Sequence, residues 1–468
     1  MLQATTAVLL ALSVGASQAL GHAGCGGHDI ARRNLGGPII GSRAELRAMQ
    51  TKRYLGPRAA AAVTDEASAA SSVDPVEECM YYSYQPVLDV VKNFPTVWQT
   101  AAIVPGDDEA TALFATINAT VNAKYPNVGP KGTHNGDWTL SKNYDAKDPD
   151  CWWTHSQCTT PAADSGLKAD IVSVPEPETW GLGFDDGPNC SHNALYDYLR
   201  DQGQKATMFY IGSNVIDWPL QALRGIDDGH QLCVHTWSHQ YMTSMTNEEA
   251  FAELYYTRKS IQTVAGVTPM CWRPPYGDVD NRIRLIAESL NLTNIVWSDD
   301  TEDWQVGTGG VTQDDVSKNY QLVIDKAGKG TYATHGPVVL NHEINNMTMA
   351  EFLTQYDKIK AGFKYVVPIA AAYNWTTPYV ETNVTFPDFM TYTNQSSGDS
   401  ASGSASATDA SGSPTAAASG GSASPSGTGS ANSSTAAKSA AALGVEVKGA
   451  AVWGVAIMLI GRIALSMW

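Results

Sequence analysis

Five short polar motifs between Gly183 and His342 contain residue types that bind metal ions and move protons. Asp186, His235 and His239 offer one carboxylate and two imidazoles, a ligand set that suits zinc or a similar divalent ion and leaves positions for water and substrate. Together the motifs predict a mononuclear metal hydrolase. In chain order they are FDDGP (184–188), HTWSH (235–239), RPPY (273–276), DTEDW (300–304) and LNH (340–342).

The two histidines of the second motif stand four residues apart at the end of a predicted strand. A tight loop must therefore bring them to one metal ion, and Thr236 and Ser238 can stabilise that loop by bonding its backbone. A single histidine is more often a core or surface residue than a ligand, and DGP alone is more often an ordinary β-turn. The carboxylate pair upstream favours the metal interpretation.

Asp185 and Asp186 are adjacent, so on a strand their side chains diverge and cannot both ligate one metal from the same face. One can bind the metal while the other abstracts a proton. Arg273 would lower the pKa of Asp185 beyond the effect of the metal, through charge-assisted hydrogen bonds. His342, as an imidazolium held by a carboxylate such as Asp303, could give a proton to a departing amine.

Tyr276 and Trp304 offer flat apolar surface against which a sugar ring can lie. Either side chain could equally be packed in the core. Both belong to motifs, so we expect them, with Leu340 of the last motif, to contact the substrate.

Short β-rich runs alternate with amphipathic stretches from about 179 to 377, which predicts parallel strands joined by crossover helices. The polar motifs follow the carboxyl ends of the strands, the rim where α/β barrels build active sites. The predicted strands are 180–184, 206–211, 231–235, 270–273, 294–298, 338–341 and 365–369. The predicted helices are 192–202, 247–264, 280–290, 313–327 and 349–361.

The whole chain has 468 residues, enough for one large catalytic domain with extensions. Its formal net charge of -17 repels phosphate backbones and argues against nucleic acid as a partner. The catalytic domain is predicted at 171–392. Residues 20–170 show no sustained periodicity, so we expect an irregular extension that wraps the barrel.

Residues 1–19 resemble a secretory signal peptide, with an apolar core and a small-residue cleavage site. Of the seven cysteines, Cys151 and Cys158 are the expected local disulfide, whereas Cys233 and Cys271 could pair or remain buried thiols. Seven sequons fit a lumenal route, although short matches also arise by chance. They are Asn118, Asn189, Asn291, Asn346, Asn374, Asn383 and Asn394.

The C-terminal part has too few large apolar residues at 393–448 to fold, and reads as a Ser/Thr/Ala/Gly-rich stalk. Small residues around Ser430, Asn432 and Ser433, followed by an apolar tail at 449–468, resemble a glycosylphosphatidylinositol signal. We therefore expect a secreted protein anchored by a lipid at the outer cell membrane or in the cell wall. A retained membrane span is the alternative, and Arg462 weakens both.

The five motifs in this order resemble those of polysaccharide deacetylases with the nodulation-deacetylase homology domain, carbohydrate esterase family 4. This resemblance covers about 176–373, with Gly183 where the family usually has Thr. With its signal, stalk and tail, the whole chain resembles fungal chitin deacetylases of the basidiomycete type. The resemblance implies a distorted (β/α) barrel that removes acetyl groups from the N-acetylglucosamine units of chitin.

The resemblance also implies one divalent metal ion, zinc or cobalt, and a role for each motif residue. Chitin or its oligomers would be the partner, and no protein partner is inferred. A non-catalytic wall glycan-binding mannoprotein and an O-acetyl esterase acting on xylan remain alternatives. The implied roles are general base for Asp185, metal ligand for Asp186, His235 and His239, general acid for His342, tuning of the base for Arg273, orientation of the acid for Asp303, and oxyanion stabilisation by the backbone N–H of Tyr276.

Overall fold

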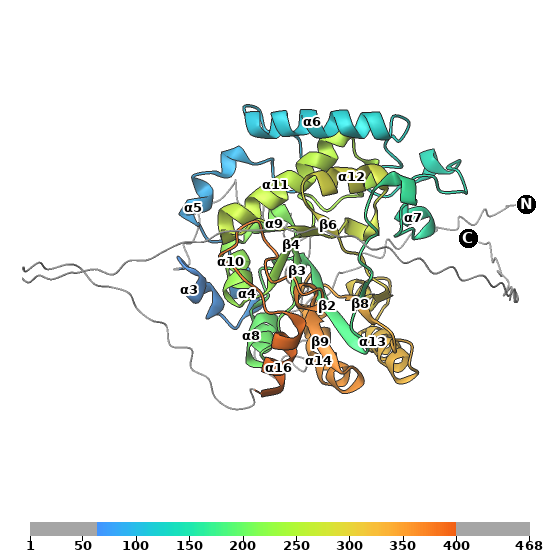
Figure 1. Ribbon diagram of the computed structural model, residues 1–468. Helices are drawn as coiled ribbons and strands as arrows, with labels where there is room; N and C mark the ends of the chain where they lie inside the picture. The colour runs from blue at the N-terminus through green and yellow to red at the C-terminus, as the bar shows by residue number, and fades with distance from the viewer. Residues whose placement is uncertain (1–62, 399–468) are drawn as a thin grey trace, which may run out of the picture. The chain divides into compact units, whose positions relative to one another are not determined.

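The computed structural model describes residues 63–398, and at its centre lies a curled sheet surrounded by helices (Figure 1). The strand order is β1-β8-β2-β3-β4-β5-β6, with β7 paired to β8 and β9 paired to β2. The strands are β1 (Ser173–Val174), β2 (Thr179–Gly187), β3 (Thr207–Tyr210), β4 (Gln231–Val234), β5 (Cys271–Trp272), β6 (Thr293–Asn294), β7 (Asp299–Asp300), β8 (Gly336–Leu340) and β9 (Tyr365–Pro368).

All strand pairs are parallel except β1 with β8. The sheet closes on itself through Ile171, which forms an isolated parallel bridge with Ile295 just before β1 pairs with β8. Ile171 N–H donates to the carbonyl of Asn294, and Val296 N–H donates to Ile171, both at 2.9 Å. The expected distorted (β/α) barrel is confirmed.

Five helices lie close to the predicted ranges, and two short helices after β3 were not predicted because Gly212, Ser213 and Pro219 interrupt the apolar pattern. The barrel helices are α8 (Asn193–Asp201), α9 (Gly212–Asp217), α10 (Pro219–Asp227), α11 (Asn247–Ala265), α12 (Asn281–Ser289), α13 (Gln313–Gly328), α14 (Asn346–Gly362), α15 (Ile369–Ala372) and α16 (Phe389–Gly398).

Two predicted boundaries are wrong. The strand expected at 294–298 ends at Asn294, because the chain turns from β5 toward β8 and resumes pairing there as β7. Residue 393, expected to begin the stalk, instead belongs to the folded part, because Thr393 is buried within α16. Packing against the barrel outweighs the low helix propensity of this polar stretch.

The N-terminal extension was predicted to be irregular, and this is wrong for the long helix α6. Its buried residues Ala110, Ile117 and Val121 form a stripe too narrow to stand out among Ala, Thr and Asn. Figure 1 shows α6 lying along α11 and α12. The other helices of the extension are α3 (Glu66–Ala70), α4 (Pro75–Glu78), α5 (Gln85–Leu88) and α7 (Trp153–Ser156).

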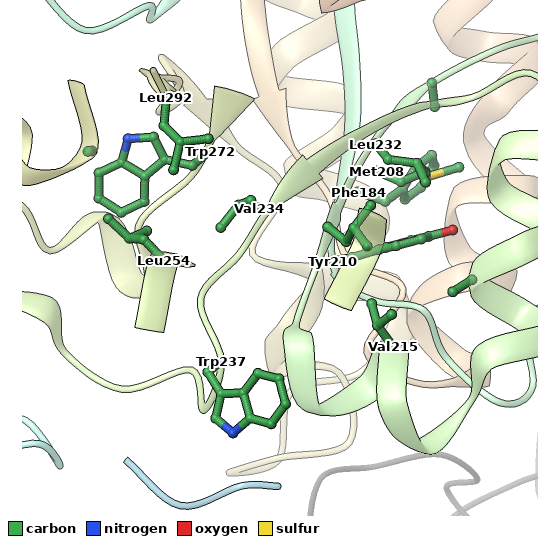
Figure 2. Packing of buried hydrophobic residues seen from close by; sticks show 14 of the residues in the cluster. Phe184, Met208, Tyr210, Val215, Leu232, Val234, Trp237, Leu254, Trp272 and Leu292 are labelled. Carbon is green, nitrogen blue, oxygen red and sulfur yellow. The ribbon is translucent and has the colours of Figure 1, made fainter. Parts of the chain in front are cut away.

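The main core lies between the sheet and its helices. Figure 2 shows this packing, in which Val234 of β4 and Trp272 of β5 lie close to Leu254 of α11 and Leu292. Trp180, Trp237 and Trp272 are fully buried, and each large ring removes much apolar surface from water. The polar rim is thus built on a rigid base.

Three disulfides lie within the described residues. Cys151–Cys158 is the expected local pair, and Cys79–Cys190 ties the extension to the barrel. Cys233 and Cys271 are bonded to each other between β4 and β5, which decides against the thiol alternative.

Two of the predicted glycosylation sites are buried, Asn189 at 1% and Asn346 at 3% exposure, so the folded structure has no room for a glycan there. Asn189 also donates to the carbonyl of Ile344 and accepts from Ser191. Asn118 is partly exposed, and the exposed sites are Asn291, Asn374, Asn383 and Asn394.

Several predictions concern residues outside the described range of 63–398. They are the signal peptide at 1–19, Cys25, the attachment candidates Ser430, Asn432 and Ser433, and the tail at 449–468. Within the described residues, none of the helices has the length and apolarity needed to cross a bilayer.

Candidate active site and metal centre

Asp186, His235 and His239 lie together at the rim, with potential ligand atoms all within 4.8 Å of one another. Asp186 Oδ1 lies 3.0 Å from His239 Nε2 and 3.6 Å from His235 Nε2. His235 Nδ1 bonds the carbonyl of Arg273 at 2.8 Å, which directs Nε2 toward Asp186. Burial lowers the pKa of His235 far below its usual value and keeps the ring neutral. These residues fit a single zinc-like ion.

The two adjacent aspartates reach the same region because β2 is irregular at its end. Its register with β3 shifts between Phe184 and Gly187, and Asp186 adopts a left-handed conformation with φ of 73°. The expected divergence of their side chains therefore does not hold. Asp185 Oδ2 lies 3.6 Å from His235 Nε2, the same distance as Asp186 Oδ1.

The loop that carries both histidines is held from below by Glu253 of α11. Its Oε2 accepts the N–H groups of Trp237 and Ser238 at 2.7 Å, and its Oε1 accepts the Ser238 hydroxyl at 2.6 Å. Thr236 Oγ1 accepts His239 N–H at 3.2 Å, as predicted, whereas the Ser238 hydroxyl bonds Glu253 and not the loop backbone that was expected. The sequence analysis did not identify Glu253. Its position on the apolar face of a predicted helix could have indicated a buried carboxylate that needs polar partners.

Asp185 is buried beside Arg273, whose Nη1 donates to Asp185 Oδ1 at 2.6 Å. The guanidinium lies 4.0 Å from the ring centroid of Phe209 and donates through Nε to the carbonyl of Ile295. Burial raises the pKa of Asp185 to about 6, although Arg273 and His342 oppose the rise. Arg273 thus lowers the pKa of Asp185 as expected, but among the protein groups desolvation outweighs the ion pair.

His342 lies beside Asp185, since the two residues form an isolated parallel bridge just beyond β8. Its Nδ1 bonds Asp303 Oδ1 at 2.6 Å and its N–H donates to Asp303 Oδ2 at 2.9 Å. Burial opposes the charged ring, but Asp303 outweighs it and raises the pKa of His342 to about 9. The imidazolium is thus the main form at neutral pH, with Nδ1 engaged by Asp303.

The polysaccharide deacetylase family model matches residues 173–295. Chitin deacetylase 2 of Cryptococcus neoformans var. grubii is 62% identical over 84% of this chain and 82% of its own length. The chain belongs to the polysaccharide deacetylase family. A chitin deacetylase of Amylomyces rouxii is 44% identical over 72% of this chain and 78% of its own.

Among solved structures, this polysaccharide deacetylase is similar to the chitin deacetylase from the fungal pathogen Colletotrichum lindemuthianum, with a TM-score of 0.40 and 20% identity. The match covers 44% of this chain and 92% of that chain.

The predicted substrate contacts of this polysaccharide deacetylase differ in accessibility. Tyr276 and Trp304 are 43% and 48% exposed, unusual for such large side chains and consistent with a binding role. Tyr276 stacks on Tyr241 with ring centroids 4.1 Å apart. Leu340 is 4% exposed and its carbonyl accepts the Thr301 hydroxyl, so its side chain contributes to the core rather than to an accessible surface.

Proposed function

We propose that this polysaccharide deacetylase hydrolyses the N-acetyl groups of chitin, producing chitosan and acetate during remodelling of the cell wall. The observation that carries the proposal is the pairing of Asp185 with Arg273 and of His342 with Asp303 around one potential metal site. Extensive identity to chitin deacetylase 2 of Cryptococcus neoformans var. grubii supports chitin as the substrate.

Asp186, His235 and His239 would hold one divalent ion, zinc or cobalt. When bound, the ion supplies Lewis acidity toward the acetyl carbonyl and makes nearby water more acidic. Two nitrogens and one carboxylate oxygen leave room for both water and substrate. The Arg273 carbonyl orients the His235 imidazole, and Glu253 fixes the loop that carries both histidines.

In this mechanism Asp185 accepts a proton from the attacking water, and Arg273 holds the carboxylate in place. The backbone N–H of Tyr276 stabilises negative charge on the acetyl oxygen. His342 donates a proton to the departing nitrogen, which leaves as an amine while acetate is released. Between about pH 6 and 9 Asp185 is mainly ionised and His342 mainly protonated, the states that these roles require.

The direct test is Asp185→Asn, which removes the proton acceptor and keeps the side-chain shape. Acetate release from N-acetylglucosamine oligomers should fall by about 10²–10⁴-fold, whereas metal content and oligomer binding should persist. Near wild-type turnover would refute Asp185 as the base. Parallel assays on acetylated xylan test the substrate, and preference for xylan would favour the esterase alternative.

We also propose that the protein is secreted and held by a glycosylphosphatidylinositol anchor at the outer membrane or transferred to the cell wall. Support comes from the signal, the stalk and the apolar tail of the sequence. Phosphatidylinositol-specific phospholipase should release the full-length protein, and deletion of 436–468 should give soluble active enzyme. Detection of 449–468 in the mature chain, without release by phospholipase, would instead establish a membrane span.

A further inference from the structure

A short loop of the N-terminal extension, the disulfide loop (residues 151–158), is anchored to the barrel by many buried bonds. The Cys151–Cys158 disulfide closes it. Arg284 of α12 donates to the carbonyls of both cysteines, at 2.7 and 2.8 Å. Trp152 is 3% exposed and its indole N–H donates to Asp278 at 2.8 Å. The loop is therefore held firmly against the segment that follows Arg273.

Trp153, the next residue in the disulfide loop, remains partly exposed although its neighbour Trp152 is buried. Its N–H donates to the carbonyl of Val279 at 2.9 Å, which directs the residue onto the barrel rim. The ring covers Gly277, where an added Cβ would lie 2.6 Å from its nearest atoms. Gly277 has a positive φ of 73° and directly follows Tyr276. The indole thus borders the predicted oxyanion-binding segment.

Trp153 also meets a second partly exposed indole, Trp297, with ring centroids 5.1 Å apart and planes inclined by 58°. The Trp297 ring lies 5.8 Å from the guanidinium of Arg273, and Arg273 bonds Asp185. A continuous series of contacts thus joins Trp153 through Trp297 and Arg273 to the proposed base Asp185. Partly exposed indoles combine a flat apolar face with a polar edge, the chemistry that suits a sugar ring.

We infer that Trp153 of the N-terminal extension and Trp297 form a sugar-binding subsite for a ring of the glycan chain other than the one being deacetylated. The inference rests on the proposed function, because it takes the N-acetylglucosamine chain as ligand. The extension is then part of the binding surface, and the disulfide loop positions its main contact. A second sugar ring bound there lowers KM for long oligomers.

The test compares Trp153→Ala and Trp153→Phe with His155→Ala, which removes an exposed ring from the same short helix. Titration calorimetry with the N-acetylglucosamine pentamer should show about tenfold weaker binding for Trp153→Ala. Trp153→Phe should lose less, and His155→Ala should bind like wild type. KM for pentamer deacetylation should rise similarly, while hydrolysis of 4-nitrophenyl acetate, which has no sugar, should change less than twofold.

Unchanged pentamer binding by Trp153→Ala would overturn the inference. Equal losses on the pentamer and on the small ester would also overturn it, since they would show Trp153 to be only a brace for Gly277. If the wild type binds the pentamer but releases no acetate, the proposed function fails while the binding comparison still decides the subsite. Melting temperatures of the variants identify any that have lost the fold.

Discussion

The two halves of the active-site rim are held in different ways. The metal-binding half carries Asp186 and both histidines, and is stabilised by the Cys233–Cys271 disulfide beneath it and by the bonds of Glu253. In the proton-donating half, His342 is held by two hydrogen bonds to the single carboxylate of Asp303. Metal geometry is thus maintained by several independent contacts, whereas proton donation depends mainly on one.

The largest expected effect follows His239→Ala, which removes a metal ligand. Activity should fall on the order of a thousandfold or more, because Lewis-acid stabilisation amounts to several kcal/mol. Bound metal, measured by elemental analysis after dialysis, should fall in parallel. His335→Ala, at an exposed histidine, is the matched control and should keep both. Full activity in metal-free protein would contradict the assignment of this half.

Asp303→Asn tests the other half and should lower kcat by about 10²–10³-fold while metal content stays normal. Asp303 raises the pKa of His342 against burial, so its neutralisation should lower that pKa from about 9. The alkaline fall in activity should therefore move to lower pH. Asp299→Asn, a buried carboxylate nearby in β7, serves as control. Loss of metal in Asp303→Asn would show that the halves are not independent.

Glu253→Gln keeps the side-chain volume but removes the charge that accepts from the histidine loop. Metal affinity should weaken about 10–100-fold, as for other residues that orient ligands. A titration in metal buffers measures this directly. Glu351→Gln, at a buried glutamate of α14, should leave affinity unchanged. Unaltered affinity in Glu253→Gln would mean that the loop keeps its shape without this carboxylate.

The smallest effect on catalysis is expected from Cys233→Ser with Cys271→Ser. The Cys233–Cys271 disulfide closes a loop of 38 residues, and its loss frees that loop in the unfolded chain. The free energy of unfolding should therefore drop by about 4 kcal/mol, while the activity of the metal-saturated enzyme changes little. The double variant Cys151→Ser, Cys158→Ser opens a disulfide between residues only 7 positions apart in the sequence. Its free energy of unfolding should therefore drop by only about 2.5 kcal/mol. Denaturant titration measures both. If the Cys233→Ser, Cys271→Ser variant is fully folded but binds metal more weakly, the disulfide has a direct role in the metal site.

Much of the site could be predicted because its functional residues come directly after strands that the sequence pattern predicts. His235, Arg273 and His342 come within two residues after β4, β5 and β8. Asp303 lies slightly farther on, in the turn after β7. Parallel strands bring such positions to one rim whatever the loops do.

What sequence reasoning could not supply depends on single backbone angles and on distant packing. The left-handed backbone conformation of Asp186 lets the carboxylates of two adjacent residues reach the same metal site. No pattern in the sequence predicts this conformation. The sequon at Asn189 is closed to glycosylation because the Asn189 side chain is buried and bonds the carbonyl of Ile344, which is distant in the sequence. The site at Trp153 involves an extension whose contacts with the barrel have no periodic signature.

The closure of the barrel at Ile171 limits where the catalytic domain can be joined to another N-terminal segment. The family model begins at residue 173, yet the bond from Ile171 to Asn294 lies just before it. A recombination event that joined a foreign N-terminus at Ser173 would leave β6 with an open, unpaired edge. A junction that keeps the barrel closed must therefore lie upstream of Ile171, so the catalytic unit that can be exchanged as a whole begins earlier than the family model does.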